Sequence, residues 1–175
     1  MPSLKISPTP PNPRLDKWIA ACLKSVPKIG GKALTVKKIG GTKANKKPFL
    51  AYKVAENDSP NSKLQSAGVH DVGIEIHLVE DRKEAEKKAE EATVFGGTTT
   101  HDARWNDVLS KFAGRYKDPD DETKTLSVAE KITRDTNGLH VWHLKDVASQ
   151  EAEPEGPDLV STLTFTATCA SIVED

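Results

Sequence analysis

The sequence predicts an α+β fold: an antiparallel or mixed sheet of about four to five strands, with two to three helices packed on one face. Three observations predict it. Between Leu159 and Cys169, apolar residues alternate with threonines, which is the period of a strand with one buried face. In residues 15–26 and 100–112, apolar residues recur at helical spacing. The connections between most predicted strands are short, which favours antiparallel or mixed pairing.

The length and composition indicate one domain with a modest core. The chain has 175 residues, of which 36% are hydrophobic and 29% are charged. Residues 1–13 contain five prolines and are expected to form an extended arm, so the domain is expected to span 14–175. No apolar run reaches the roughly 18 residues of a membrane span, and a signal peptide is not expected. Cys22 and Cys169 lie in apolar patterns, which predicts buried thiols in a reduced, cytosolic protein.

The first part of the domain is expected to contain one helix and two strands. Asn12 is expected to cap the helix, Pro13 to occupy its first position, and Pro27 to end its apolar stripe. The strands are expected at Ala33–Ile39 and Phe49–Val54. The second is expected to return beside the first after a lysine-rich loop, as in a hairpin.

A strong strand and two helices are expected next. Val69–Val79 alternates between apolar and polar residues, which predicts a strand with one buried face. Glu80–Ala92 is rich in Glu, Lys and Ala and has almost no apolar stripe, so it predicts an exposed helix. Thr100–Phe112 predicts an amphipathic helix that Gly114 ends. Leu126–Ile132 is compatible with a short strand or a helical turn.

The chain is expected to end in a strand pair, Leu139–Val147 and Leu159–Cys169. The acidic segment Glu151–Asp158 contains two prolines and is expected to be the loop between them, and Ser171–Asp175 to be a short tail. The apolar face of the last strand is expected to cover the core. Its threonine face is then left as a surface for a neighbour.

Charge is distributed unevenly along the chain. Residues 1–55 contain twelve Lys and Arg and one acid, whereas residues 56–175 contain thirteen Lys and Arg and 25 Asp and Glu. The formal charges of the two parts are therefore +11 and −12. This pattern is typical of a chain that contacts a polyanion or whose copies meet through complementary surfaces, but also of a solvated surface whose charges mix on folding. The predicted interaction surface consists of Lys37, Lys38, Lys43, Lys46, Lys47, Glu151, Glu153, Glu155 and Asp158.

No motif identifies a catalytic or cofactor site, and neither enzymatic activity nor a cofactor is expected. The glycine pairs at residues 30–31 and 40–41 lack the spacing of a phosphate-binding or dinucleotide-binding loop and are expected to be turns. His101 and Asp102 are adjacent, as in some acid–base pairs. However, no nucleophile lies in an elbow motif, so both are expected to be polar residues of a helix's first turn.

The other histidines do not predict a metal site. His140 and His143 are three residues apart, which places them on opposite faces of a strand. Glu75 and His77 share a face, which is weak support for acid–base chemistry. An enzyme or a metal protein would require His77 and His143 to meet across two strands beside a carboxylate.

The order of the predicted elements is informative as a whole. It consists of an amphipathic helix, a returning strand, a strong central strand, a helix opening with Thr-x-Asp, and two final strands, namely Leu15–Val26, Phe49–Val54, Val72–Val79, Thr100–Phe112, Leu139–Val147 and Leu159–Cys169. This order resembles that of the tail-terminator proteins of long-tailed bacteriophages, also described as tail-completion, minor tail or head–tail joining proteins. The proline arm, the helix Glu80–Ala92 and the loop Asp118–Ile132 depart from the pattern.

The resemblance implies a non-enzymatic structural protein of the virion tail or neck, made in the host cytoplasm. Its copies would form a homo-oligomeric ring, usually a hexamer, that caps the tail tube. Its partners would be the tail tube protein and the head–tail connector proteins, with no membrane. The basic loop Lys37–Lys47 would face DNA in the lumen or an acidic neighbour. The alternative is a small nucleic-acid-binding domain that uses the same lysines as a basic patch.

Overall fold

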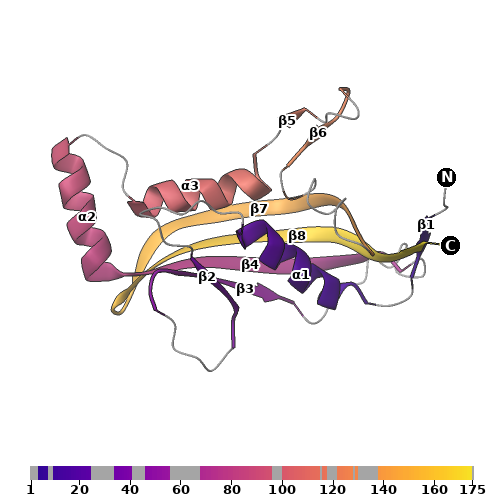
Figure 1. Ribbon diagram of the computed structural model, residues 1–175, viewed down its shortest axis with the longest axis horizontal. Helices are drawn as coiled ribbons and strands as arrows, with labels where there is room; N and C mark the ends of the chain where they lie inside the picture. Colours follow the sequence, from indigo (N-terminus) through magenta and orange to yellow (C-terminus); the bar gives the residue numbers. More distant parts are fainter. Residues whose placement is uncertain are drawn as a thin grey trace.

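The structure is a computed structural model that describes residues 4–7, 10–24, 34–40, 46–55, 68–95, 100–114, 116–117, 122–127, 129 and 138–174. These residues form three helices, a six-stranded mixed sheet and a separate two-stranded sheet (Figure 1). The predicted α+β class is therefore confirmed. The main sheet has more strands than the four to five expected.

Five strands of the main sheet lie side by side in the order β7-β8-β4-β3-β2, and the sixth, β1, pairs with the end of β8. Only the β2–β3 pair is parallel among the described strands. The strands are β1 (Leu4–Ile6), β2 (Thr35–Lys38), β3 (Phe49–Val54), β4 (His70–Asp81), β7 (Leu139–Glu155) and β8 (Asp158–Glu174). The two-stranded sheet consists of β5 (Tyr116–Lys117) and β6 (Thr125–Leu126).

Two helices, α1 (Asn12–Lys24) and α3 (Thr100–Phe112), cover one face of the sheet, while α2 (Arg82–Phe95) extends away from it (Figure 1). The ring of Phe112 in α3 lies 6.3 Å from that of Trp18 in α1 and stacks on Phe165 of β8 at 5.1 Å. The ring of Phe112 thus joins α1 and α3 to β8. The apolar residues predicted on the buried side of the last strand, Leu163, Phe165 and Cys169, are all buried, as expected.

The ends of the helices follow local hydrogen bonding. The carbonyl of Pro11 accepts the first amides of α1, and the side chain of Asn12 donates to the carbonyl of Ala55 at 2.9 Å. Asn12 is therefore inside the helix, and its prediction as the cap is wrong. β4 runs to Asp81, two residues past the predicted strand end. Asp81 caps α2, because its Oδ1 accepts the amide of Glu84 at 3.0 Å. Gly114 follows the end of α3, as predicted, and its amide donates to the carbonyl of Ser110. A side chain would not fit at this position, because a Cβ would lie 2.4 Å from that carbonyl oxygen.

The last two strands are longer than the sequence predicted. β7 and β8 have 17 residues each and are joined by a tight turn at Gly156 and Pro157. Gly156 has φ 59°, which a glycine adopts without strain. The predicted loop Glu151–Asp158 is thus strand apart from the two turn residues, and the predicted tail is strand from Ser171 to Glu174. Pro154 is tolerated because β7 lies at the edge of the sheet, where none of the described strands needs its missing amide.

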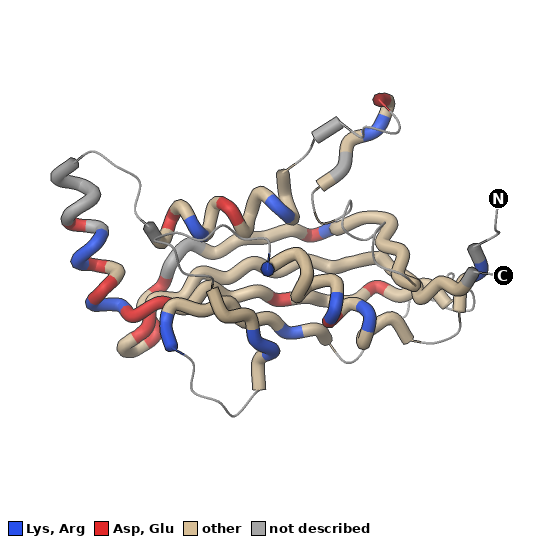
Figure 2. The backbone as a smooth tube through the Cα atoms, in the orientation of Figure 1, with Lys and Arg blue, Asp and Glu red and all other residues tan. Residues whose placement is uncertain are grey.

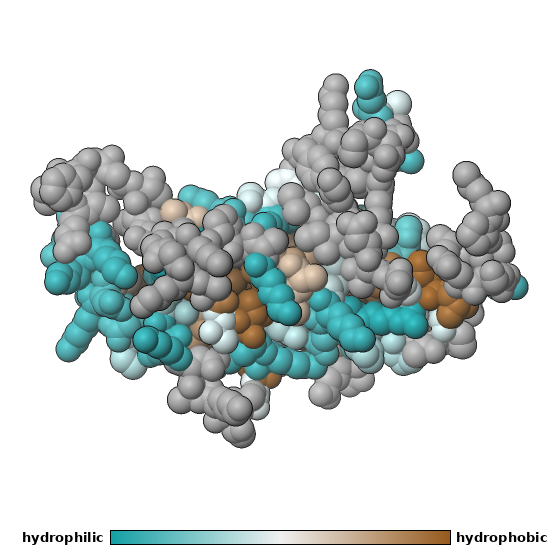
Figure 3. All heavy atoms as spheres, viewed as in Figure 1, coloured by the Kyte–Doolittle hydropathy of each residue, from teal (hydrophilic) through white to brown (hydrophobic). Residues whose placement is uncertain are grey.

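Two further predictions about strands are wrong. β2 and β3 are parallel, with Thr35 beside Phe49 and Lys38 beside Tyr52, so they do not form the expected hairpin. Of the predicted arm, residues 1–13, the structure describes 4–7 and 10–13; the arm contributes a strand, and its last two residues, Asn12 and Pro13, already belong to α1. Its residues Leu4–Ile6 pair with the end of β8. At this end of the sheet, hydrophobic atoms are visible on the face shown in Figure 3.

Candidate functional site

The lysines of the predicted interaction surface that lie on β2 have partners within the chain. Lys37 Nζ lies 4.1 Å from the centre of the Phe49 ring, a cation–π contact. Lys38 Nζ lies 2.9 Å from Asp16 Oδ2 on α1. The β2 edge therefore carries positive charge that is partly neutralised. Of the lysines in the following connection, Lys46 is exposed and Lys43 lies outside the described residues.

The acidic part of this surface lies at the far end of the β7–β8 hairpin. Glu153 and Glu155 are exposed on β7, and the side chain of Glu151 is outside the described part. Asp158 pairs with Lys47 of the same chain. Folding thus brings one basic and one acidic residue of the predicted surface together, and in Figure 2 basic and acidic residues are interspersed over the chain. The remaining predicted residues are not joined to each other by a described contact.

The face of the sheet opposite α1 and α3 is polar. We call it the polar face; in β4 and β8 it consists of Asp71, Gly73, Glu75, His77, Thr162, Thr164, Thr166 and Thr168, which pair across the two strands. The sequence predicted this threonine row. Its side chains are half-buried or exposed, apart from Thr168, which is buried.

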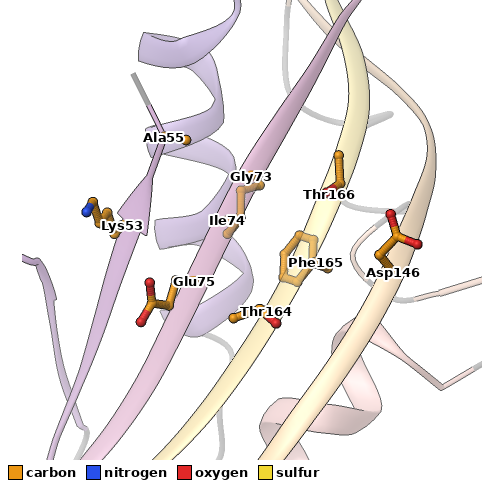
Figure 4. A pocket seen from close by; sticks show the side chains of 9 residues that line it. All are labelled: Lys53, Ala55, Gly73, Ile74, Glu75, Asp146, Thr164, Phe165 and Thr166. Atoms are coloured by element: carbon orange, nitrogen blue, oxygen red, sulfur yellow. The ribbon is translucent and has the colours of Figure 1, made fainter. Parts of the chain in front are cut away.

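A shallow groove of about 400 Å³ lies on the polar face. Gly73 is at its centre because the missing side chain leaves space between strands, and a Cβ there would meet only Ala55 at 3.7 Å. Figure 4 shows Lys53 on one side of the groove and Asp146 on the other, with α1 behind the sheet. The rims carry both signs of charge, so the groove does not select a cation or an anion.

One end of the polar face is held by a carboxylate network. Asp71 accepts hydrogen bonds from Lys145 Nζ at 2.7 Å and from Thr168 Oγ1 at 2.5 Å. Burial alone would raise the pKa of Asp71, but these two hydrogen bonds and the charge of Lys145 lower it below its ordinary value. The network links β4, β7 and β8 and keeps the carboxylate charged.

The histidines of the polar face do not converge. His77 Nε2 lies 2.5 Å from Glu75 Oε1, so the pair predicted to share a face is in contact. His77 is level with Thr162 on β8, whereas His143 is level with Thr168. Six residues of strand, about 20 Å, therefore separate the two rings. The hypothesis that they form one site is wrong, and no group of three metal-ligating side chains occurs among the described residues.

A second cluster, which was not predicted from the sequence, lies on the helix-covered face. His101 Nδ1 lies 2.7 Å from Glu80 Oε2, and His101 Nε2 lies 2.7 Å from the hydroxyl of Ser161. Arg104 NH1 donates to Glu80 Oε1. We call these four residues the buried network; they join α3 to β4 and β8. His101 and Asp102 were both expected to be polar first-turn residues, but only Asp102 is exposed.

The buried network has the atom order of a serine–histidine–carboxylate triad, but a substrate cannot reach it. Ser161 is 0% exposed, and Glu80, His101 and Arg104 are each below 8%. Burial alone would raise the pKa of Glu80, but the hydrogen bonds and charges of His101 and Arg104 lower it. A charged, fully paired carboxylate between a strand and a helix is an arrangement for holding α3, and it does not expose a nucleophile.

The two cysteines are buried free thiols, as predicted. Burial raises the pKa of the Cys22 thiol to about 12. Since only the thiolate is nucleophilic, Cys22 is unreactive near neutral pH.

Comparison with known proteins gives no family assignment. A scan of protein-family models found no match, and a search of curated proteins found no relative. Within the described part of the chain, no helix has both the length and the apolar character needed to cross a membrane.

Proposed function

We propose that this chain is a non-enzymatic structural subunit of a tailed-bacteriophage virion. In this proposal its copies form a closed ring, expected to be a hexamer, that terminates the tail tube and joins it to the head connector. The order of elements that suggested this function is supported by a sheet with helices on one face and a long terminal hairpin.

The observation that carries the proposal is that the sheet is half-covered. α1 and α3 bury the apolar face, whereas among the described residues no helix covers the polar face. The two outer strands, β2 and β7, each pair with one described strand only. Open strand edges and an uncovered polar face are the surfaces through which β proteins join neighbours. A ring subunit requires two unlike surfaces on opposite sides, and the two edges differ in sequence and charge.

The nucleic-acid-binding alternative has less support. Phosphate binding depends on the number of available cations, since each contact releases counterions. Lys38 is paired with Asp16 and Lys47 with Asp158, so the cluster of positive charge seen along the sequence is reduced in the fold. Lys37 and the exposed Lys46 remain for contact with DNA in a lumen.

The test is the oligomeric state of the purified chain, alone and with tail tubes from the phage that encodes it. Mass photometry and negative-stain electron microscopy are expected to show closed rings of one size, free or at the ends of tubes. A chain that stays monomeric at all concentrations and ignores the tubes contradicts the proposal. DNA retention at low salt that is lost in Lys37→Glu/Lys46→Glu, without rings, would favour the alternative.

A further inference from the structure

The two edges of the main sheet run in opposite directions. β7 is antiparallel to β8, β8 to β4 and β4 to β3, whereas β2 is parallel to β3. β2 and β7 are therefore antiparallel to each other at the two sides of one sheet. If a second copy is placed beside the first by rotation, β2 of one copy meets β7 of the next as an antiparallel neighbour.

Residues of β2 and β7 lie at the same height along the strands, on opposite edges of the sheet. Following the pairing across the sheet, Thr35 is level with Glu153, and Lys37 is level with Gln150. A junction without stagger places Lys37 opposite Gln150 of the neighbour and diagonal to its Glu153. A long lysine side chain spans such a diagonal, which is about 7–8 Å.

The edges are complementary in charge. β2 contributes Lys37, since Lys38 is paired with Asp16 of its own chain, whereas the end of β7 contributes the exposed acids Glu153 and Glu155. Opposite charges across a junction favour this pairing, and like charges disfavour β2–β2 or β7–β7 pairing. This complementarity selects a head-to-tail contact, which closes into a ring when the rotation between copies divides a full turn.

β7 also limits where a neighbour can pair. Asp146 has φ 54°, which interrupts the edge, and Pro154 has no amide to donate. These residues bracket the segment 148–153, whose described side chains, Ala148, Ser149, Gln150 and Glu153, are exposed. The register shift between Gln150 and Glu153 falls inside this segment, so the four residues of β2 would lie beside five residues of β7, Ser149 to Glu153.

From these observations we infer that β2 of one copy adds to the 148–153 segment of β7 in the next copy, so that the sheets join around the ring. The inference rests on the proposed ring function and names its contact. The occupant of each edge is a second copy of this chain, held by backbone hydrogen bonds and by contact of Lys37 with Glu153.

Cysteine cross-linking tests this contact. Two variants are used. Lys37→Cys/Gln150→Cys places the two cysteines opposite each other if the strands join without stagger. Lys37→Cys/Glu153→Cys does so if the strands are shifted until Lys37 lies opposite Glu153. In one chain Lys37 and Gln150 are four strand spacings apart, roughly 19 Å, so an intramolecular disulfide is excluded. Cys22 and Cys169 are 0% exposed and are not expected to form disulfides between chains. The control is Lys53→Cys/Gln150→Cys, because Lys53 is exposed on the polar face but lies on the inner strand β3.

After mild oxidation, at least one of the two variants is expected to give a ladder of covalent multimers on a non-reducing gel, with most of the monomer lost. The control and the single-cysteine variants are expected to give none. Rings seen by mass photometry without a ladder in either variant would overturn the edge contact and leave the proposed function standing. A chain that forms no oligomer overturns both.

Discussion

The two faces of the sheet each hold a charged carboxylate, and the surroundings of the two differ. Glu80 lies on the helix-covered face, is 6% exposed and is bonded to His101 and Arg104 of α3. Asp71 lies on the polar face and is bonded to Lys145 of the half-exposed edge strand and to Thr168. Hydrogen bonds lower the pKa of both carboxyl groups. Charge on one face therefore fixes a helix, whereas charge on the other ties the edge strand β7 to β4 and β8.

The largest effect is expected at Glu80. Glu80→Ala leaves the buried Arg104 without its carboxylate, so the free energy of unfolding is expected to fall by about 3–5 kcal/mol. Urea unfolding followed by circular dichroism measures this. The matched control is Glu75→Ala on the polar face, where the side chain is 41% exposed and a loss of no more than about 1 kcal/mol is expected. Equal losses in the two variants would contradict the contrast between the faces.

Adjacent residues of β8 provide the next comparison. Leu163 is 0% exposed in the core and Thr164 is exposed on the polar face. Leu163→Ala is expected to lower the unfolding free energy by about 2–5 kcal/mol, because it removes buried methyl groups and leaves a cavity. Thr164→Ala is expected to cost within about 1 kcal/mol. If Thr164→Ala is as destabilising, the polar face is covered within the monomer.

Glu80 and Asp71 are also expected to contribute differently to the pH dependence of the unfolding free energy. Their folded pKa values lie below those of the unfolded chain, near 4.3 for Glu and 3.9 for Asp, so the unfolded state binds more protons as pH falls. Each ionised carboxylate therefore stabilises the fold fully when the pH is above its unfolded pKa. This stabilisation is lost as the pH falls through the folded pKa. Unfolding from pH 6 to pH 3 is expected to be less pH-dependent in Glu80→Gln than in wild type. Asp71→Asn is expected to change the slope less, because solvent screens the partly exposed Lys145.

The smallest effect is one of reactivity. With a pKa of about 12, Cys22 has a thiolate fraction on the order of one in ten thousand at pH 8. A thiol reagent such as DTNB is expected to label neither cysteine in the folded chain and both in urea. Rapid labelling of the folded chain would show that α1 detaches from the core.

Sequence patterns predicted which side of each long strand is buried, because period two is a local property. The threonine row and the apolar set of β8 were found in this way. They did not predict strand direction: nothing in the spacing of Ala33–Ile39 and Phe49–Val54 distinguishes a hairpin from the observed parallel pair. The length of the final hairpin was also missed, since acidic residues and prolines disfavour strands locally, while pairing with β8 extends them.

The buried network was missed because its members are far apart in the sequence. A signal was nevertheless present. Glu80 continues the buried positions of β4, Ser161 lies at a buried position of β8, and His101 falls four residues before Trp105 on the apolar stripe of α3. Polar residues at apolar positions on three facing elements predict a buried polar contact. The interaction surface was chosen from charge along the sequence, which cannot show that Lys47 and Asp158 meet in one chain.

In the proposed assembly, copies of this chain join into a closed ring. The most direct measurement is mass photometry of the purified chain with and without tail tubes, combined with electron microscopy of the tube ends. One closed species is expected, reduced several-fold in Glu153→Lys/Glu155→Lys and restored when Lys37→Glu is added. A chain that stays monomeric and does not cap a tube would rule out the proposed ring.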